Sequence, residues 1–233
     1  MSLSKIYEDG TYLKNNPAWG VPDSKWKAKI IKDLLEKNRL HPNKITEVGC
    51  GAGGILEALS DKAGTDAQFS GYDISLHAIK MARQRETKNL KFYNEDFLIK
   101  EIHTDLLLVI DVVEHIPAYY EFLQNIKSKS DYFVFHIPLD LSCRTIFKPH
   151  VLQQQREAVG HLHYFTREMV LWFLKDTGYE ILDWVYTKPV VDVHYSQNTK
   201  TFIKKLLRNL SFAVSKDISA KMWGNYSMMI LAK

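Results

Sequence analysis

Short apolar runs alternate along this chain with stretches of helical period. One unbroken apolar run is Leu-Leu-Leu-Val-Ile within 105–111, and its lack of alternation is typical of a strand covered on both faces in a parallel sheet. We therefore place it at the centre of the sheet. Further strands are predicted over 45–48, 67–73, 90–97, 131–137, 180–186 and 226–232. The pattern predicts an α/β fold, with a doubly wound, mostly parallel sheet and helices on both of its faces.

Start and stop residues delimit the helical stretches. Ser75 and Thr166 each precede a helical period as N-caps, and Gly178 is a suitable C′ residue after the second of these helices. An N-terminal helix is expected to begin from Asp23 or Ser24 as its N-cap. Its lysines are expected mostly to face water: Lys25, Lys27, Lys29 and Lys32. Other helices are predicted over 54–62, 75–84 and 118–127.

A glycine-rich loop follows the first of the sheet strands. Gly49, Gly51 and Gly54 satisfy the dinucleotide-binding spacing G-x-G-x-x-G. Glu47, Gly49, Gly51 and Gly53 also satisfy the E/D-x-G-x-G-x-G loop of S-adenosylmethionine-dependent methyltransferases. Glycine spacing alone therefore leaves two classes of nucleotide cofactor open.

Charge separates these two classes. A pyrophosphate needs backbone N–H groups with no anion nearby, whereas S-adenosylmethionine is a cationic nucleoside without phosphate. The ends of the predicted strands carry carboxylates, which favour the cationic ligand: Glu47, Asp73, Asp96 and Asp111. Asp73 stands 24 positions after Gly49, close to the spacing at which an acid binds a ribose diol. Asp96 could accept from an adenine amino group while Phe97 covers the ring.

The chain is long enough for one full α/β domain with insertions. It has 233 residues, 45% of them hydrophobic, and its formal charge of +4 is too small to indicate nucleic-acid binding by itself. The two cysteines lie far apart in sequence, which argues against a disulfide or a zinc site. No secretory signal or transmembrane run is visible, so we expect a cytoplasmic protein.

Five motifs in this order give the chain a family resemblance: Glu47-Val-Gly-Cys-Gly-Ala-Gly53, Tyr72-Asp73-Ile74, Glu95-Asp96-Phe97, Asp111-Val-Val-Glu-His-Ile116 and His161-Leu-His-Tyr-Phe-Thr166. Over about residues 25–186 the chain resembles class I S-adenosylmethionine-dependent methyltransferases. It looks most like the broad group that contains the ubiquinone-biosynthesis O-methyltransferases. The resemblance implies a Rossmann-like seven-stranded sheet with the last strand antiparallel, S-adenosylmethionine as cofactor and S-adenosylhomocysteine as product.

The resemblance also implies which residues hold the cofactor. The glycine loop would take the methionine moiety, Asp73 the ribose and Asp96 the adenine. The expected cofactor-binding residues are Glu47, Gly49, Cys50, Gly51, Gly53, Asp73, Ile74, Asp96, Phe97, Asp111 and Val112.

Methyl transfer needs a side chain for chemistry only where the acceptor loses a proton. His115 is our candidate for this catalytic base because it lies beside the expected sulfonium position, with His136 and His161 as lesser candidates. Some related O-methyltransferases hold a divalent metal with a Glu-x-x-Glu-His set. Here Asp111 occupies the first position of that set, an arrangement in which many relatives bind no metal, so we expect none.

The sequence therefore predicts a methyltransferase that acts on a small-molecule acceptor at oxygen or nitrogen. An RNA acceptor and an NAD(P)-dependent oxidoreductase are the alternatives. Within the single domain we expect an N-terminal arm over 1–22 that packs against the domain or closes over the cofactor, and acceptor-side insertions over 138–163 and 187–225. The second insertion contains a basic amphipathic helix over 202–210, compatible with a substrate cap, a homodimer surface or contact with a membrane surface.

Overall fold

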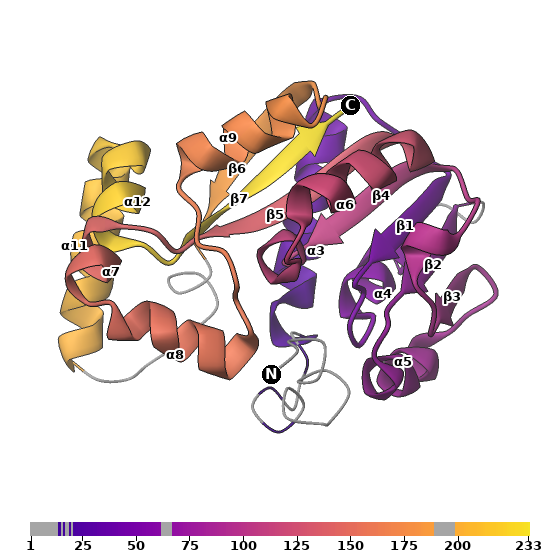
Figure 1. The fold of residues 1–233 in the computed structure, drawn as a ribbon, viewed down its shortest axis with the longest axis horizontal. Coiled ribbons are helices and arrows are strands. Elements are labelled where there is room, and N and C mark those ends of the chain that lie inside the picture. Colours follow the sequence, from indigo (N-terminus) through magenta and orange to yellow (C-terminus); the bar gives the residue numbers. More distant parts are fainter. Residues whose placement is uncertain (1–13, 15, 17–18, 20, 62–66, 189–198) are drawn as a thin grey trace.

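Seven strands form one sheet in the order β3-β2-β1-β4-β5-β7-β6 (Figure 1). The computed structural model describes residues 14, 16, 19, 21–61, 67–188 and 199–233, without the side chains of 199–205. The strands are β1 (Lys44–Val48), β2 (Gln68–Tyr72), β3 (Leu90–Tyr93), β4 (Thr104–Ile110), β5 (Ser130–Leu139), β6 (Ile181–Thr187) and β7 (Tyr226–Ala232). Strands β1 to β5 pair in parallel, and β7 lies antiparallel between β5 and β6. The expected sheet is confirmed.

Helices cover both faces of this sheet (Figure 1). The main helices are α3 (Val21–Lys37), α4 (Gly54–Ser60), α5 (Leu76–Ala82), α6 (Tyr119–Ile126), α7 (Cys143–Phe147), α8 (His150–Val159), α9 (Arg167–Asp176), α11 (Thr199–Val214) and α12 (Lys216–Trp223). Short 3-10 helices include η1 (Arg83–Arg85), η2 (Phe97–Ile99), η3 (Val113–His115) and η4 (Lys127–Lys129).

Strand β4 explains why the sheet has two hydrophobic cores. Leu106 and Leu108 pack with side chains of α3, α4 and α5, whereas Leu107 and Val109 pack with those of α6 and α9. All four are completely buried. The apolar run without alternation therefore lies at the sheet's centre, as its pattern indicates.

Two predicted helix starts are confirmed, and one is wrong. The side chains of Ser75 and Thr166 accept from the backbone N–H groups that follow three residues later, and Gly178 has φ +89°. Helix α3, however, already includes Val21. Asp23 therefore lies in its first turn, and Ser24 is buried within the helix instead of capping it.

The two acceptor-side insertions contain helices that gather at one end of the sheet (Figure 1). Along the chain, α7 and α8 come between β5 and α9, and α11 and α12 come between β6 and β7. Arg208 of the predicted basic helix does not face water, because its guanidinium is buried and donates to the carbonyls of Trp223 and Gly224, each at 3.1 Å.

Most of the predicted N-terminal arm, including Tyr7 and Tyr12, lies outside the described residues. Its boundary at residue 22 falls inside α3. Among the residues that the structure describes, no helix combines the length and the apolar character needed to span a bilayer.

Candidate functional site

The glycine loop turns the chain from the end of β1 into α4. Gly49 has φ +68°, and a Cβ added there would lie 2.6 Å from Cγ2 of Val112. Gly51 has φ +53°, and a Cβ there would lie 2.7 Å from Cδ1 of Trp19. Both positions therefore need glycine for backbone conformation as well as for space.

Asp73 fixes this loop to the end of β2. Its Oδ2 accepts from the Gly51 N–H at 2.9 Å, and its Oδ1 accepts from the Ser75 N–H at 2.7 Å. Burial raises the pKa of Asp73, and the N–H donors of Ser75 and Gly51 oppose that effect only in part. Each carboxylate oxygen retains acceptor capacity beyond its one backbone bond, so the same side chain could also accept ribose hydroxyls.

A cavity of about 620 Å³ opens at the carboxyl ends of β1, β2 and β4. Its walls bring together eleven of the twelve site residues expected from the sequence: Glu47, Gly49, Cys50, Gly51, Asp73, Ile74, Asp96, Phe97, Asp111, Val112 and His115. Gly53 is not among the lining residues. It is the N-cap residue of α4, and a Cβ there would collide with the Phe92 ring. Trp19, the described aromatic residue of the N-terminal arm, also lines the cavity.

The Glu95-Asp96-Phe97 motif is a turn and does not belong to a strand. Strand β3 ends at Tyr93, and Asp96 caps η2 by accepting from the Leu98 N–H at 2.9 Å. Phe97 is buried, and the centre of its ring lies 5.3 Å from that of Tyr72. The predicted acid and aromatic residue therefore do meet at the cavity, but a short helical turn positions them.

Asp111 lines the cavity and is held by two cationic or proton-donating partners. Its Oδ2 lies 2.5 Å from Lys27 Nζ, and its Oδ1 lies 2.5 Å from His136 Nδ1. Burial would raise the pKa of Asp111, but His136 and Lys27 more than offset this and hold the pKa well below its usual range. Lys27 is buried, so the expectation that it faces water is wrong.

His136, one of the lesser candidates for the catalytic base, belongs to the same hydrogen-bond network. Its Nε2 lies 2.9 Å from the Thr187 hydroxyl, so each ring nitrogen has a polar partner. Glu47, by contrast, is 1% exposed, and burial raises its pKa well above the ordinary value. The carboxylates at the strand ends therefore do not form a row of equivalent anions.

Glu114, next to His115, also has an environment that is unfavourable for a charge. Its side chain is completely buried, and neither carboxyl oxygen has a hydrogen-bond partner among the described residues. Burial first, and Asp111 second, raise its pKa well above the ordinary value. This environment favours the neutral, protonated form of Glu114. In the sequence Glu114 stands beside a candidate base, but no local signal indicates that its side chain is buried.

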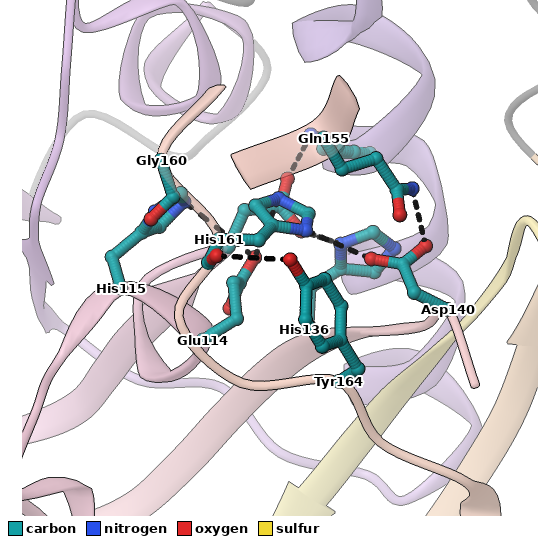
Figure 2. Close-up of polar contacts among 10 residues, drawn as sticks. Glu114, His115, His136, Asp140, Gln155, Gly160, His161 and Tyr164 are labelled. Atoms are coloured by element: carbon teal, nitrogen blue, oxygen red, sulfur yellow. Dashed lines mark hydrogen bonds and ion pairs between the residues drawn. The ribbon is translucent and has the colours of Figure 1, made fainter. Parts of the chain in front are cut away.

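Two histidines flank Glu114, and the three side chains point toward one another (Figure 2). His115 Nδ1 lies 3.1 Å from the carbonyl of Gly160, and His161 Nδ1 lies 2.8 Å from Asp140. A carbonyl only accepts, so His115 Nδ1 carries the proton and Nε2 the lone pair. Burial, reinforced by the neighbouring His161, lowers the pKa of His115 to about 4. His115 is therefore uncharged at neutral pH.

Comparison with known proteins now decides between the two classes of cofactor. The profile of the methyltransferase domain family matches residues 23–183 of this chain. The chain belongs to this family. The expected class I S-adenosylmethionine-dependent methyltransferase is confirmed, and the NAD(P)-dependent oxidoreductase alternative is not supported. The match is to the broad family, so membership of the ubiquinone-biosynthesis group stays a prediction.

Solved structures similar to this methyltransferase share its fold. Magnesium protoporphyrin IX methyltransferase from Synechocystis PCC 6803, with bound S-adenosylhomocysteine, has a TM-score of 0.60 at 15% identity, covering 89% of this chain and 82% of that one. A chain from the complex between the Haloferax volcanii Trm112 methyltransferase activator and its methyltransferase has a TM-score of 0.66 at 14% identity, covering 96% and 94%.

The match to curated relatives covers a smaller part of each chain. Ribosomal RNA small subunit methyltransferase A of Mesomycoplasma hyopneumoniae is 27% identical over 128 residues, which are 52% of this chain and 47% of the relative. The chain thus spans about half the length of the curated relatives it matches.

One group of side chains in this methyltransferase has donors that fit a divalent metal. One ligand atom each from Glu114, His115 and His161 lie within 4.8 Å of one another. Each imidazole has its Nδ1 engaged by an oxygen acceptor, as metal-binding histidines commonly do. This differs from the set that the sequence suggests, because His161 takes the place of Asp111, whose carboxylate is bound by Lys27 and His136. The expectation of no metal stays a prediction.

Proposed function

We propose that this methyltransferase transfers a methyl group from S-adenosylmethionine to oxygen or nitrogen of a small-molecule acceptor. The observation that carries the proposal is a single cavity whose walls include the glycine loop, Asp73 and His115. Its volume of about 620 Å³ is in the range of small-molecule sites. The residues that would bind the cofactor and the candidate base thus line one cavity.

The cofactor would lie across the carboxyl ends of β1 and β2. The methionine moiety would contact the glycine loop, the ribose would donate to Asp73, and the adenine would lie near Asp96 and Phe97. These regions follow β1, β2 and β3, which are neighbours in the sheet, and all three line the cavity. Val112 lies against Gly49 of the loop, so the sulfonium end would lie close to the η3 turn that carries His115.

His115 would act as the general base. In the reaction the bond between sulfur and the methyl carbon breaks as the acceptor's bond to that carbon forms, and the acceptor becomes positively charged. Its proton is therefore acidic in the transition state, so a weak base is sufficient. An imidazole with a pKa of about 4 is weak, but it is uncharged at neutral pH and can accept this proton at Nε2.

An RNA acceptor is the second candidate, supported by the similarity to a ribosomal RNA methyltransferase over 128 residues. Non-specific RNA binding depends mainly on neutralising phosphates with basic side chains. The weak net charge of +4 favours the small-molecule acceptor.

The experiment incubates the protein with S-adenosylmethionine labelled on the methyl group and, separately, with a small-molecule extract or with total RNA. We expect label in the small-molecule fraction. With the labelled acceptor identified, His115→Asn is expected to lower the rate by about 10²- to 10⁴-fold while leaving S-adenosylhomocysteine affinity nearly unchanged.

His163→Asn is the matched control, because His163 lies near His115 in the fold but binds the Ile116 carbonyl and does not line the cavity. It is expected to retain activity. Label in RNA alone would establish the alternative acceptor. A fully active His115→Asn would show that another group, or water, takes the proton.

A further inference from the structure

Three neighbouring helices of the acceptor-side insertions expose large apolar side chains. Helix α12 packs against both α11 and α7, and the three helices lie together at one end of the sheet (Figure 1). Their exposed apolar residues, which we call the apolar patch, are Ile146, Phe147, Leu206, Leu207, Leu210, Val214, Ile218 and Met222. Phe147 is 84% exposed and Val214 is 88% exposed. Such a concentration of apolar surface indicates an interaction site.

In the part of α11 whose side chains are described, 206–214, Phe212 stacks on the buried Tyr226, but a basic residue is also buried and several apolar residues are exposed. Arg208 points inward, where it is buried against Gly224 and Trp223. Leu206, Leu210 and Val214 follow one another at a spacing of four residues, which places them on one outward face. A surface helix normally buries its apolar stripe. This one buries its arginine and presents leucine and valine to solvent.

The sequence of α7 and α11 is basic. It has no acidic residue over 143–148 or over 199–214, whereas these segments contain Arg144, Lys148, Lys200, Lys204 and Lys205 besides the buried Arg208. Lys148 and Lys216 are exposed. The two acids next in sequence to these segments both have partners: Asp217 pairs with the Tyr186 hydroxyl and Arg167, and Asp140 with His161 and Gln155.

We propose that the apolar patch binds the surface of a bilayer that contains anionic phospholipids. Apolar side chains would enter the boundary between headgroups and acyl chains, and the lysines beside them would contact lipid phosphates. This combination of exposed leucine, isoleucine and phenylalanine with flanking lysine is the composition of interfacial helices. Basic residues near an anionic leaflet add to the apolar contribution.

A second copy of the chain fits the patch less well. Two copies that meet through it would bring the exposed Lys148 and Lys216 of each together, and the described side chains of α7 and α11 include no acid to offset this repulsion. An anionic surface supplies the opposite charge. Contact with the bilayer is additional to the proposed methyl transfer, because none of the patch residues lines the cavity.

The test is co-sedimentation of the full-length protein with vesicles of phosphatidylcholine alone and of phosphatidylcholine mixed with phosphatidylglycerol. The wild type is expected to associate with the mixed vesicles, and less so as salt rises, because surface charges are screened. Leu210→Glu should weaken association by about tenfold or more, since it loses the burial of a leucine side chain and adds a negative charge. Lys216→Glu tests the contribution of charge alone and should also weaken it.

Trp172→Glu is the matched control. Trp172 is an exposed apolar residue on α9, outside the patch, so this variant should associate as the wild type does. Circular dichroism and a melting curve for each variant verify that it is folded. Leu210 is itself exposed, so its substitution removes no core contact.

Four outcomes would overturn the proposal. The first two are that the wild type does not associate with mixed vesicles, and that it associates equally with phosphatidylcholine alone. The other two are that folded Leu210→Glu associates as fully as the wild type, and that Trp172→Glu loses as much vesicle association as Leu210→Glu does. A wild-type dimer that Leu210→Glu dissociates, with no vesicle association, would assign the patch to a second copy instead.

Discussion

Replacing Asp73 by alanine removes a carboxylate that serves the glycine loop and, in the proposed complex, the ribose. Loss of a charge-assisted pair of hydrogen bonds to the ribose is expected to weaken S-adenosylhomocysteine binding by about 10- to 100-fold, or about 1.4 to 2.8 kcal/mol. The same change leaves the N–H groups of Gly51 and Ser75 without their acceptor. Each such loss costs about 1 to 3 kcal/mol where water cannot replace the partner.

These two effects can be separated by measurement. Isothermal titration with S-adenosylhomocysteine gives the affinity, and denaturant unfolding without ligand gives the stability. Asp73→Asn keeps one acceptor oxygen, so its loss of stability should be smaller than that of Asp73→Ala. Asp96→Ala, which removes the exposed cap of η2, is the control and should destabilise the fold less. Unchanged affinity in folded Asp73→Ala would refute the proposed ribose contact.

Three further predictions concern the buried charges. Above about pH 4.5, the ordinary pKa of a glutamate, native Glu114 keeps a proton that the unfolded chain releases, so this residue makes stability fall as pH rises. Glu114→Gln should therefore gain melting temperature relative to the wild type with increasing pH, and a parallel pH dependence of the two proteins would contradict this. Lys27→Met should destabilise the fold by about 3 to 5 kcal/mol because Asp111 loses its buried partner, whereas the control Lys29→Met, whose ion pair is exposed, should cost about 0 to 1 kcal/mol in denaturant unfolding. Titration with magnesium or manganese, with S-adenosylhomocysteine present, should give no heat above dilution, because the proton on Glu114 competes with a cation. A saturable heat that Glu114→Gln abolishes would show that this residue is a metal ligand.

The sheet could be predicted from the sequence because its signals are local. The run within 105–111 has the composition of a strand buried on both faces, and Ser75 and Thr166 satisfy N–H groups three residues away. Neither signal depends on distant parts of the chain. The glycine loop is equally local, since positive φ at Gly49 and Gly51 is a property of the turn itself.

The electrostatics of the site could not be predicted in this way. Lys27 stands in a series of lysines on one helix, and only the packing of α3 against the sheet brings it to Asp111, 84 positions later. Glu114 follows an ordinary apolar strand, and the segment after α8 lies against it: Leu162 and His163 donate to its carbonyl, and His161 Nε2 lies 3.9 Å from its Oε1. The acidic motif of the sequence therefore combines an ion-paired carboxylate, Asp111, with one whose pKa is raised by burial, Glu114.

The chain that follows α8 has a consequence for how the enzyme responds to its acceptor. The N–H groups of Leu162 and His163 donate to the Glu114 carbonyl, and the Gly160 carbonyl accepts from His115. An acceptor that shifts this segment would therefore also disturb the turn that orients the imidazole. A poorly fitting acceptor would then bind more weakly and also react more slowly once bound. Differences among acceptors should therefore appear in kcat and not in KM alone.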